Sequence, residues 1–144
     1  MKYLYTIIIF LFSIFSFSQS KLSSLIITSA EIINQSVLKE DKVFLSIQGF
    51  NDIINIINSN KFIIVEQLSK DKAKEIFDDT KIVIVVKSFK INSNQNATII
   101  LEIQSWKYYG KKQKGIVLLY SIAIDKSISL DLIYNCNTNK WEKI

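Results

Sequence analysis

Four apolar, β-rich runs in the second half of the chain constrain the fold more than any other feature. They are Lys81–Ile91, Ala97–Tyr109, Gly115–Ile124 and Ser127–Asn135. Runs of this length that are rich in Val, Ile and Tyr are typical of strands, and short polar linkers favour antiparallel neighbours. We therefore expect an antiparallel meander, with a tight turn at Asp125–Ser127 and a short last strand at Trp141–Ile144.

The pattern within each run indicates which face is buried, because successive side chains of a strand point to opposite faces. In the second run, Ile99, Leu101 and Ile103 share one face, and the other carries Thr98, Ile100, Glu102, Gln104 and Trp106. The third run is apolar on both sides, which predicts a central strand covered on both faces. Helices would cover one face, and sheet curvature or a partner subunit the other.

The first half of the chain reads mainly as helices. Apolar spacing predicts one helix over Ser20–Glu40 and a second over Val43–Ile57, capped by Asp41 and weakened at Gly49. The turn Asn58–Lys61, the strand Phe62–Leu68 and the short helix Lys70–Phe77, capped by Ser69, would then lead into the meander.

This order of elements predicts an α+β domain with N-terminal helices packed on a curved antiparallel sheet of four to five strands. The arrangement, with its final Trp-Glu-Lys-Ile strand, loosely resembles the cone-shaped NTF2-like and cystatin-like folds. The resemblance lies in a pattern of elements and not in a motif, and such folds carry many unrelated functions.

Residues 1–18 have the organisation of a secretory signal peptide. Lys2 precedes an apolar run, and Ser16 and Ser18 suit a cleavage before Gln19. The run is shorter than the roughly 20 residues that a membrane span needs. We expect a single mature domain, 19–144, in the bacterial periplasm or outside the cell. The alternative is an uncleaved leader that anchors the chain to the membrane.

Missing residue types exclude several chemistries. The chain of 144 residues has no His and one Cys, and all of its 18 basic residues are Lys. It therefore cannot build a Ser-His-Asp triad or the usual zinc site, and it has no glycine-rich phosphate loop. We expect no cofactor and no metal. We expect Cys136 to be a small buried residue on the last long strand, or else to pair with another chain.

Three polar residues are candidates for a pocket. Glu102 and Gln104 share a strand face with Trp106, and Asp131 lies on a nearby strand. A carboxylate on a half-apolar face can act as an acid or base, and a second carboxylate would complete a pair. The competing interpretation is that Glu102 faces solvent or pairs with a lysine.

The segment 106–114 is the strongest candidate for a binding site. It brings three aromatic residues to a basic hairpin tip, namely Trp106, Tyr108, Tyr109, Lys111, Lys112 and Lys114. Aromatic rings stack on sugars and ammonium groups attract anions. The competing interpretation is that lysines at a hairpin tip only prevent edge pairing. The absence of Arg argues against nucleic acid, because no side chain offers a bidentate fork.

These observations favour a small exported, non-catalytic binding domain. Its partner would be an envelope protein, a second copy bound through the sheet, or an anionic glycan. One alternative is an NTF2-like small-ligand-binding protein or a carboxylate-based hydrolytic enzyme with a pocket near Glu102 and Asp131. Another is an inhibitor or immunity protein.

The basic hairpin tip generates the first prediction. Changing Lys111, Lys112 and Lys114 together to Ser should weaken retention on an anionic polysaccharide column, because three ammonium groups are lost. Retention is measured as the salt concentration at elution. Elution at the wild-type salt concentration would remove the tip as a glycan-binding site.

Overall fold

The computed structural model describes residues 19–50, 61–93, 95–108 and 119–144. The predicted signal peptide, the later part of the predicted second helix, Tyr109 and the three tip lysines lie outside the described residues. The expectations for those segments stay predictions.

The described residues form an α+β fold around one six-stranded sheet. The strands are β1 (Val43–Ser46), β2 (Phe62–Ile64), β3 (Lys81–Ile91), β4 (Asn96–Tyr108), β5 (Leu119–Asn135) and β6 (Lys140–Lys143). Their order across the sheet is β2-β1-β3-β4-β5-β6. β1 runs parallel to both β2 and β3, and the remaining pairs are antiparallel. The α+β prediction is confirmed, but the expectation of a purely antiparallel sheet of four to five strands is wrong.

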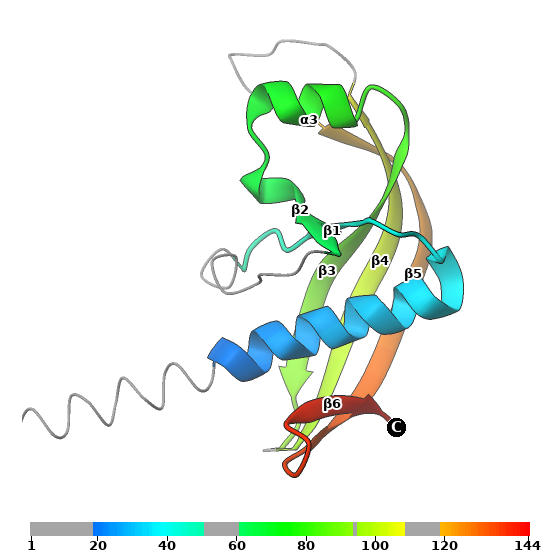
Figure 1. The fold of residues 1–144 in the computed structure, drawn as a ribbon. Helices are drawn as coiled ribbons and strands as arrows, with labels where there is room; N and C mark the ends of the chain where they lie inside the picture. The colour runs from blue at the N-terminus through cyan, green and yellow to red at the C-terminus, as the bar shows by residue number, and fades with distance from the viewer. Residues whose placement is uncertain (1–18, 51–60, 94, 109–118) are drawn as a thin grey trace, which may run out of the picture.

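The predicted first helix is present over residues 19–38. It is α-helical over 19–33 and continues as the wider turn η1 (Asn34–Leu38). Figure 1 shows it crossing one face of the curved strands β3, β4 and β5. The wider turn changes the phase of the helix, since a π-helix holds more residues per turn. This explains why Val37, which the spacing places in the buried stripe, is 43% exposed.

The predicted helix over Val43–Ile57 is wrong in its described part. Residues 43–46 form β1, and a turn follows in which Gly49 has a φ of 90°. Val43, Leu45 and Ile47 are all buried, so the apolar residues fit a period of two as well as a helical spacing. Parallel pairing of β1 with β2 and β3, which lie later in the chain, selects the strand.

The segment between β1 and β3 is partly as expected. The strand predicted over Phe62–Leu68 stops at Ile64, and Val65–Gln67 form the 3-10 turn η2. The short helix is confirmed as α3 (Lys70–Ile76), and the Ser69 side chain accepts a hydrogen bond from the Lys72 amide at 3.3 Å. This bond satisfies one of the free amides of the first helical turn.

The turn predicted at Asp125–Ser127 is wrong, because β5 runs through it as one strand. Ile103 pairs with Lys126 and Gln104 with Ile124, so Asp125 is an extra residue, a β-bulge. A bulge bends a strand and increases its twist. The polar residues from which the sequence predicted a turn therefore bend β5 and do not end it.

Cys136 is exposed, so the prediction that it is buried is wrong. β5 ends at Asn135, whose Oδ1 accepts the Asn137 amide at 3.0 Å and starts the turn into β6. Because an Asn side chain readily closes such a turn, the strand stops one residue before the cysteine. The last strand itself, expected over Trp141–Ile144, is confirmed as β6 with a shift of one residue.

Two apolar clusters cover opposite faces of the sheet. The main cluster joins the N-terminal helix to the inner face, and it includes Leu25, Ile26, Ile33, Leu45, Ile84, Ile99, Leu101 and Leu132. The second cluster, on the outer face, is Val65, Phe77, Val83 and Val85, with Phe44, Leu68, Ile76, Trp106 and Tyr108 against it. It lies under α3 and η2. The predicted alternation of β4 between the two faces is confirmed.

Adjacent residues of β4 provide a matched test of this assignment. Ile99 is fully buried, and Ile100, on the other face, is 38% exposed. Ile99→Ala should lower the free energy of unfolding by about 2–5 kcal/mol, because it leaves a cavity in the main cluster. Ile100→Ala should cost less than about 1 kcal/mol. Urea unfolding measures both, and equal losses would contradict the assignment of faces.

Candidate functional site

The two candidate carboxylates share the outer face of the sheet but stand apart on it. Glu102 pairs across the sheet with Ser127, whereas Asp131 pairs with Thr98. This offset of four residues corresponds to about 13 Å along the strand. Asp131 is exposed and accepts a hydrogen bond from the Thr98 hydroxyl at 2.7 Å. The structure therefore does not bring the two carboxylates together.

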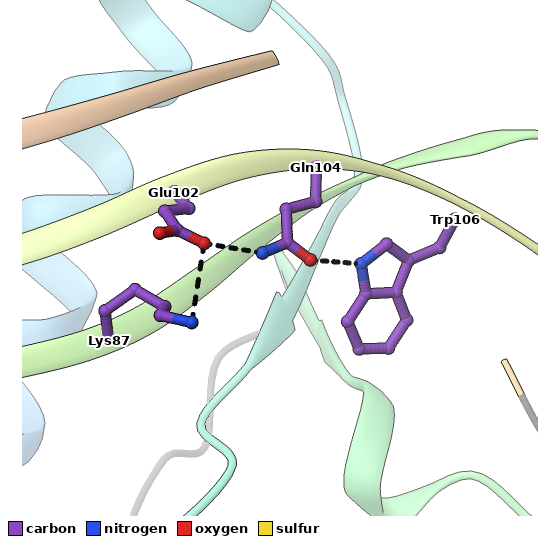
Figure 2. A network of polar contacts seen from close by, with 4 residues as sticks. All are labelled: Lys87, Glu102, Gln104 and Trp106. Atoms are coloured by element: carbon purple, nitrogen blue, oxygen red, sulfur yellow. Dashed lines mark hydrogen bonds and ion pairs between the residues drawn. The ribbon is translucent and has the colours of Figure 1, made fainter. Parts of the chain in front are cut away.

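Glu102 belongs instead to a chain of polar contacts along one face of β4 (Figure 2). Gln104 Nε2 donates to Glu102 Oε2 at 2.6 Å, and Trp106 Nε1 donates to Gln104 Oε1 at 2.8 Å. Lys87 Nζ lies 3.5 Å from the same Glu102 oxygen. We call these four residues the polar chain. The competing interpretation of Glu102, pairing with a lysine, matches this geometry.

A second bulge places the lysine of the polar chain. Val86 pairs with Leu101 and Ser88 with Ile100, so Lys87 is the extra residue of β3. Bulges re-aim side chains in this way. Gln104 is buried. Its amide nitrogen donates to Glu102, and its amide oxygen accepts from Trp106. The polar chain is thus satisfied from within, as a buried polar group requires.

Two aromatic residues at the base of the predicted binding hairpin, Trp106 and Tyr108, contact the end of α3. The Trp106 ring lies 6.4 Å from the Phe77 ring, and the Tyr108 amide donates to the Phe77 carbonyl at 2.8 Å. Both side chains are half-buried against the second cluster. The structure therefore gives Trp106 and Tyr108 a packing role. The rest of this candidate site lies outside the described residues.

An open groove, which the sequence did not predict, lies between the N-terminal helix and β6. Its volume is about 570 Å³, and it is lined by Ser24, Ile27, Thr28, Glu31, Ile32, Gln35, Asn139, Lys140, Trp141 and Lys143. A smaller hollow of about 220 Å³ shares Ser24 and Asn139 with it and adds Ser20, Lys21 and Tyr134. The helical part of the lining recurs every three or four residues. This spacing was visible in the sequence, but the sequence did not show that β6 lies against the helix.

Trp141 holds β6 against the helix and so shapes the groove. Its indole N–H donates to the Lys21 carbonyl at 3.0 Å, and its ring meets Tyr134 edge-on with centroids 5.2 Å apart. The Lys21 ammonium lies 4.3 Å from the centre of the Tyr134 ring, within cation–π range. The hydrogen bond between Trp141 and Lys21 joins residues 120 positions apart in the chain.

The lining of the groove mixes charged, hydroxyl, amide and apolar side chains. Glu31 is the single carboxylate in its lining, beside Lys140 and Lys143, and partly buried isoleucines form the flank of the helix. One carboxylate does not make an acid–base pair. Within the part of the chain that the structure describes, no three Cys, Asp or Glu side chains gather as a metal site.

The polar chain can be tested by adding a second carboxyl. At neutral pH, Gln104→Glu should lower the free energy of unfolding by about 1–3 kcal/mol, because two carboxylates then meet where an amide donated. The folded protein binds a proton there more readily than the unfolded chain, so stability falls as pH rises. The deficit should therefore shrink as pH falls towards about 4. Urea unfolding at both pH values measures it.

Gln104→Leu is the matched control. It removes both hydrogen bonds of the amide without adding a charge. Its loss of stability should therefore change less between the two pH values than the loss for Gln104→Glu. A deficit for Gln104→Glu that does not depend on pH would contradict the close contact with Glu102.

Among the described residues, no helix combines the length and the apolar content that a membrane crossing requires. Comparisons with protein-family models, curated proteins and solved structures find no match to this chain. A functional proposal for this protein therefore depends on the geometry of its own residues.

Proposed function

We propose that this protein is a small exported, non-catalytic domain that binds a protein partner in the groove between the N-terminal helix and β6. The observation that carries the proposal is the groove itself. It is open, about 570 Å³ in volume, and lined by apolar, hydroxyl, amide and charged side chains. Such mixed lining is typical of surfaces that bind other proteins.

The contacts of the candidate catalytic groups support binding over turnover. Glu102 is held by Gln104 and Lys87, and Asp131 is bonded to Thr98 on an open face. A hydrolytic enzyme built on these carboxylates needs both at one substrate, and their offset of about 13 Å along the strand gives that alternative no support. An inhibitor or immunity protein is one form of the proposed function, since it also acts by holding a protein.

Export is the second part of the proposal, and it depends on residues 1–18. Their charged start, apolar run and small residues before Gln19 fit a secretory leader. The envelope or the surrounding medium is therefore where the partner should be sought. The loose resemblance to NTF2-like and cystatin-like folds adds no functional weight, because such folds carry unrelated activities.

The proposal predicts a partner that depends on the groove. Tagged mature chain, immobilised and exposed to envelope and culture-medium fractions of the producing cells, should retain a specific protein. Thr28→Arg, in the groove lining, should abolish this retention, because a long charged side chain fills the space. Ser129→Arg, which places the same side chain on the exposed outer face of β5, is the matched control.

Mass spectrometry identifies the retained proteins, and circular dichroism checks that both variants fold. A protein retained equally by wild type and Thr28→Arg would show that binding does not use the groove. Hydrolysis of a substrate by the purified chain, abolished by Glu102→Gln, would replace the proposal with the enzyme alternative.

A further inference from the structure

We infer that the mature chain begins with pyroglutamate, the cyclic lactam that an N-terminal glutamine forms with its own side chain, and that this modification stabilises the start of the N-terminal helix. The modified residue is Gln19. It becomes the N-terminus only when the leader is cleaved after Ser18, so the inference rests on the export part of the proposed function.

The predicted cleavage gives Gln19 the one group that the reaction needs. Ser16 and Ser18 are the small residues before the cut, so Gln19 would carry the free α-amine. The amine nitrogen attacks the side-chain amide carbon, a new N–C bond closes the ring, and the side-chain nitrogen leaves as ammonia. All of these atoms belong to Gln19, and the step uses neither an oxidant nor a co-reactant.

The fold leaves Gln19 able to react. The residue is helical and only partly buried, so it stays within reach of an enzyme that catalyses ring closure. Closing the ring turns only the side-chain bonds of Gln19, whereas the helix continues through its backbone carbonyl. The lactam and the folded helix are therefore compatible.

Hydrogen bonds hold the helix very close to the predicted cut. The Ser20 carbonyl accepts the Ser23 hydroxyl at 3.0 Å, and the Lys21 carbonyl accepts the Trp141 indole N–H at 3.0 Å. The second bond ties the first helical turn of the mature chain to β6. The α-amine of Gln19 would therefore lie at the N-terminus of a fixed helix.

A charged amine is unfavourable at this position. The free N–H groups of a first helical turn carry a partial positive charge, which a second positive charge opposes. Residues 19–30 include Lys21 and no acidic residue. Among the described residues, those that line the smaller hollow beside this turn include no carboxylate either. The lactam is neutral, so its formation removes one positive charge from the helix start.

Mass spectrometry of the protein from its own cells tests the inference. The chain is purified in the cold from envelope and culture-medium fractions and digested at once with a protease that cuts after glutamate. The N-terminal fragment, residues 19–31, should be lighter than its unmodified sequence by one ammonia. Fragment ions should place this loss on Gln19. An aminopeptidase should not shorten the fragment until a pyroglutamyl peptidase has removed the lactam.

Gln19→Asn is the matched control. It keeps a side-chain amide but is one carbon shorter, so its lactam would be a strained four-atom ring and the amine stays free. Its N-terminal fragment should keep the full mass. Its urea midpoint should lie about 0.2–0.5 M below that of the wild type, because the charge stays at the helix N-terminus. High salt should narrow this gap, since it screens exposed charges.

The outcomes separate the modification from export. Cleavage at another bond, a free amine on Gln19, or loss of ammonia that develops only on storage would overturn the inference and leave export standing. The same loss in the Gln19→Asn fragment would also overturn it, because the ammonia would then come from another residue. Equal urea midpoints would overturn the stabilising effect. A chain recovered from inside the cell with its leader intact would overturn both proposals.

Discussion

The structure depends on the packing of one helix stripe against the inner face of the sheet. Leu25, Ile26, Ala30 and Ile33 are each no more than 1% exposed, and they belong to one cluster with side chains from all six strands. Burying an aliphatic side chain of this size contributes about 1.5–3 kcal/mol, so the stripe supplies a large part of the stability of a small fold. It also keeps the sheet in one piece, since β1 and β2 are too short to persist without such a cover.

The curvature of the sheet follows from extra residues in its long strands. Lys87 in β3 and Asp125 in β5 each stand unpaired in the ladder, and Asp125 lies where the sequence predicted a turn. Bulges at these positions bend the strands around the helix and bring β6 to its flank. The groove is therefore a product of curvature. Its two walls lie more than 100 residues apart in the chain and meet only because the sheet bends.

Polar residues of the outer face form hydrogen bonds with one another. Gln104 links Trp106 to Glu102, and the aromatic ring beside it packs under α3. Groups fixed by internal partners stabilise a single arrangement, which suits a scaffold. The edge of the sheet at β6 differs, because two lysines, Lys140 and Lys143, line the open groove there. The proposed function, contact with another protein, is based on this difference.

The sequence alone determined the features that depend on local periodicity and local caps. The spacing of apolar residues predicts four features: the N-terminal helix, α3, β3 and the two faces of β4. The Ser69 cap of α3 follows from the hydrogen bond that its side chain accepts in the first helical turn. It also excluded histidine-based chemistry. Only the tertiary structure decided that Val43–Ser46 is a parallel strand, that Asp125 is a bulge and that β6 faces the helix. The physical reason is that each of these depends on pairing between distant segments, whose energy exceeds the small local preferences of a short apolar run or a polar dipeptide.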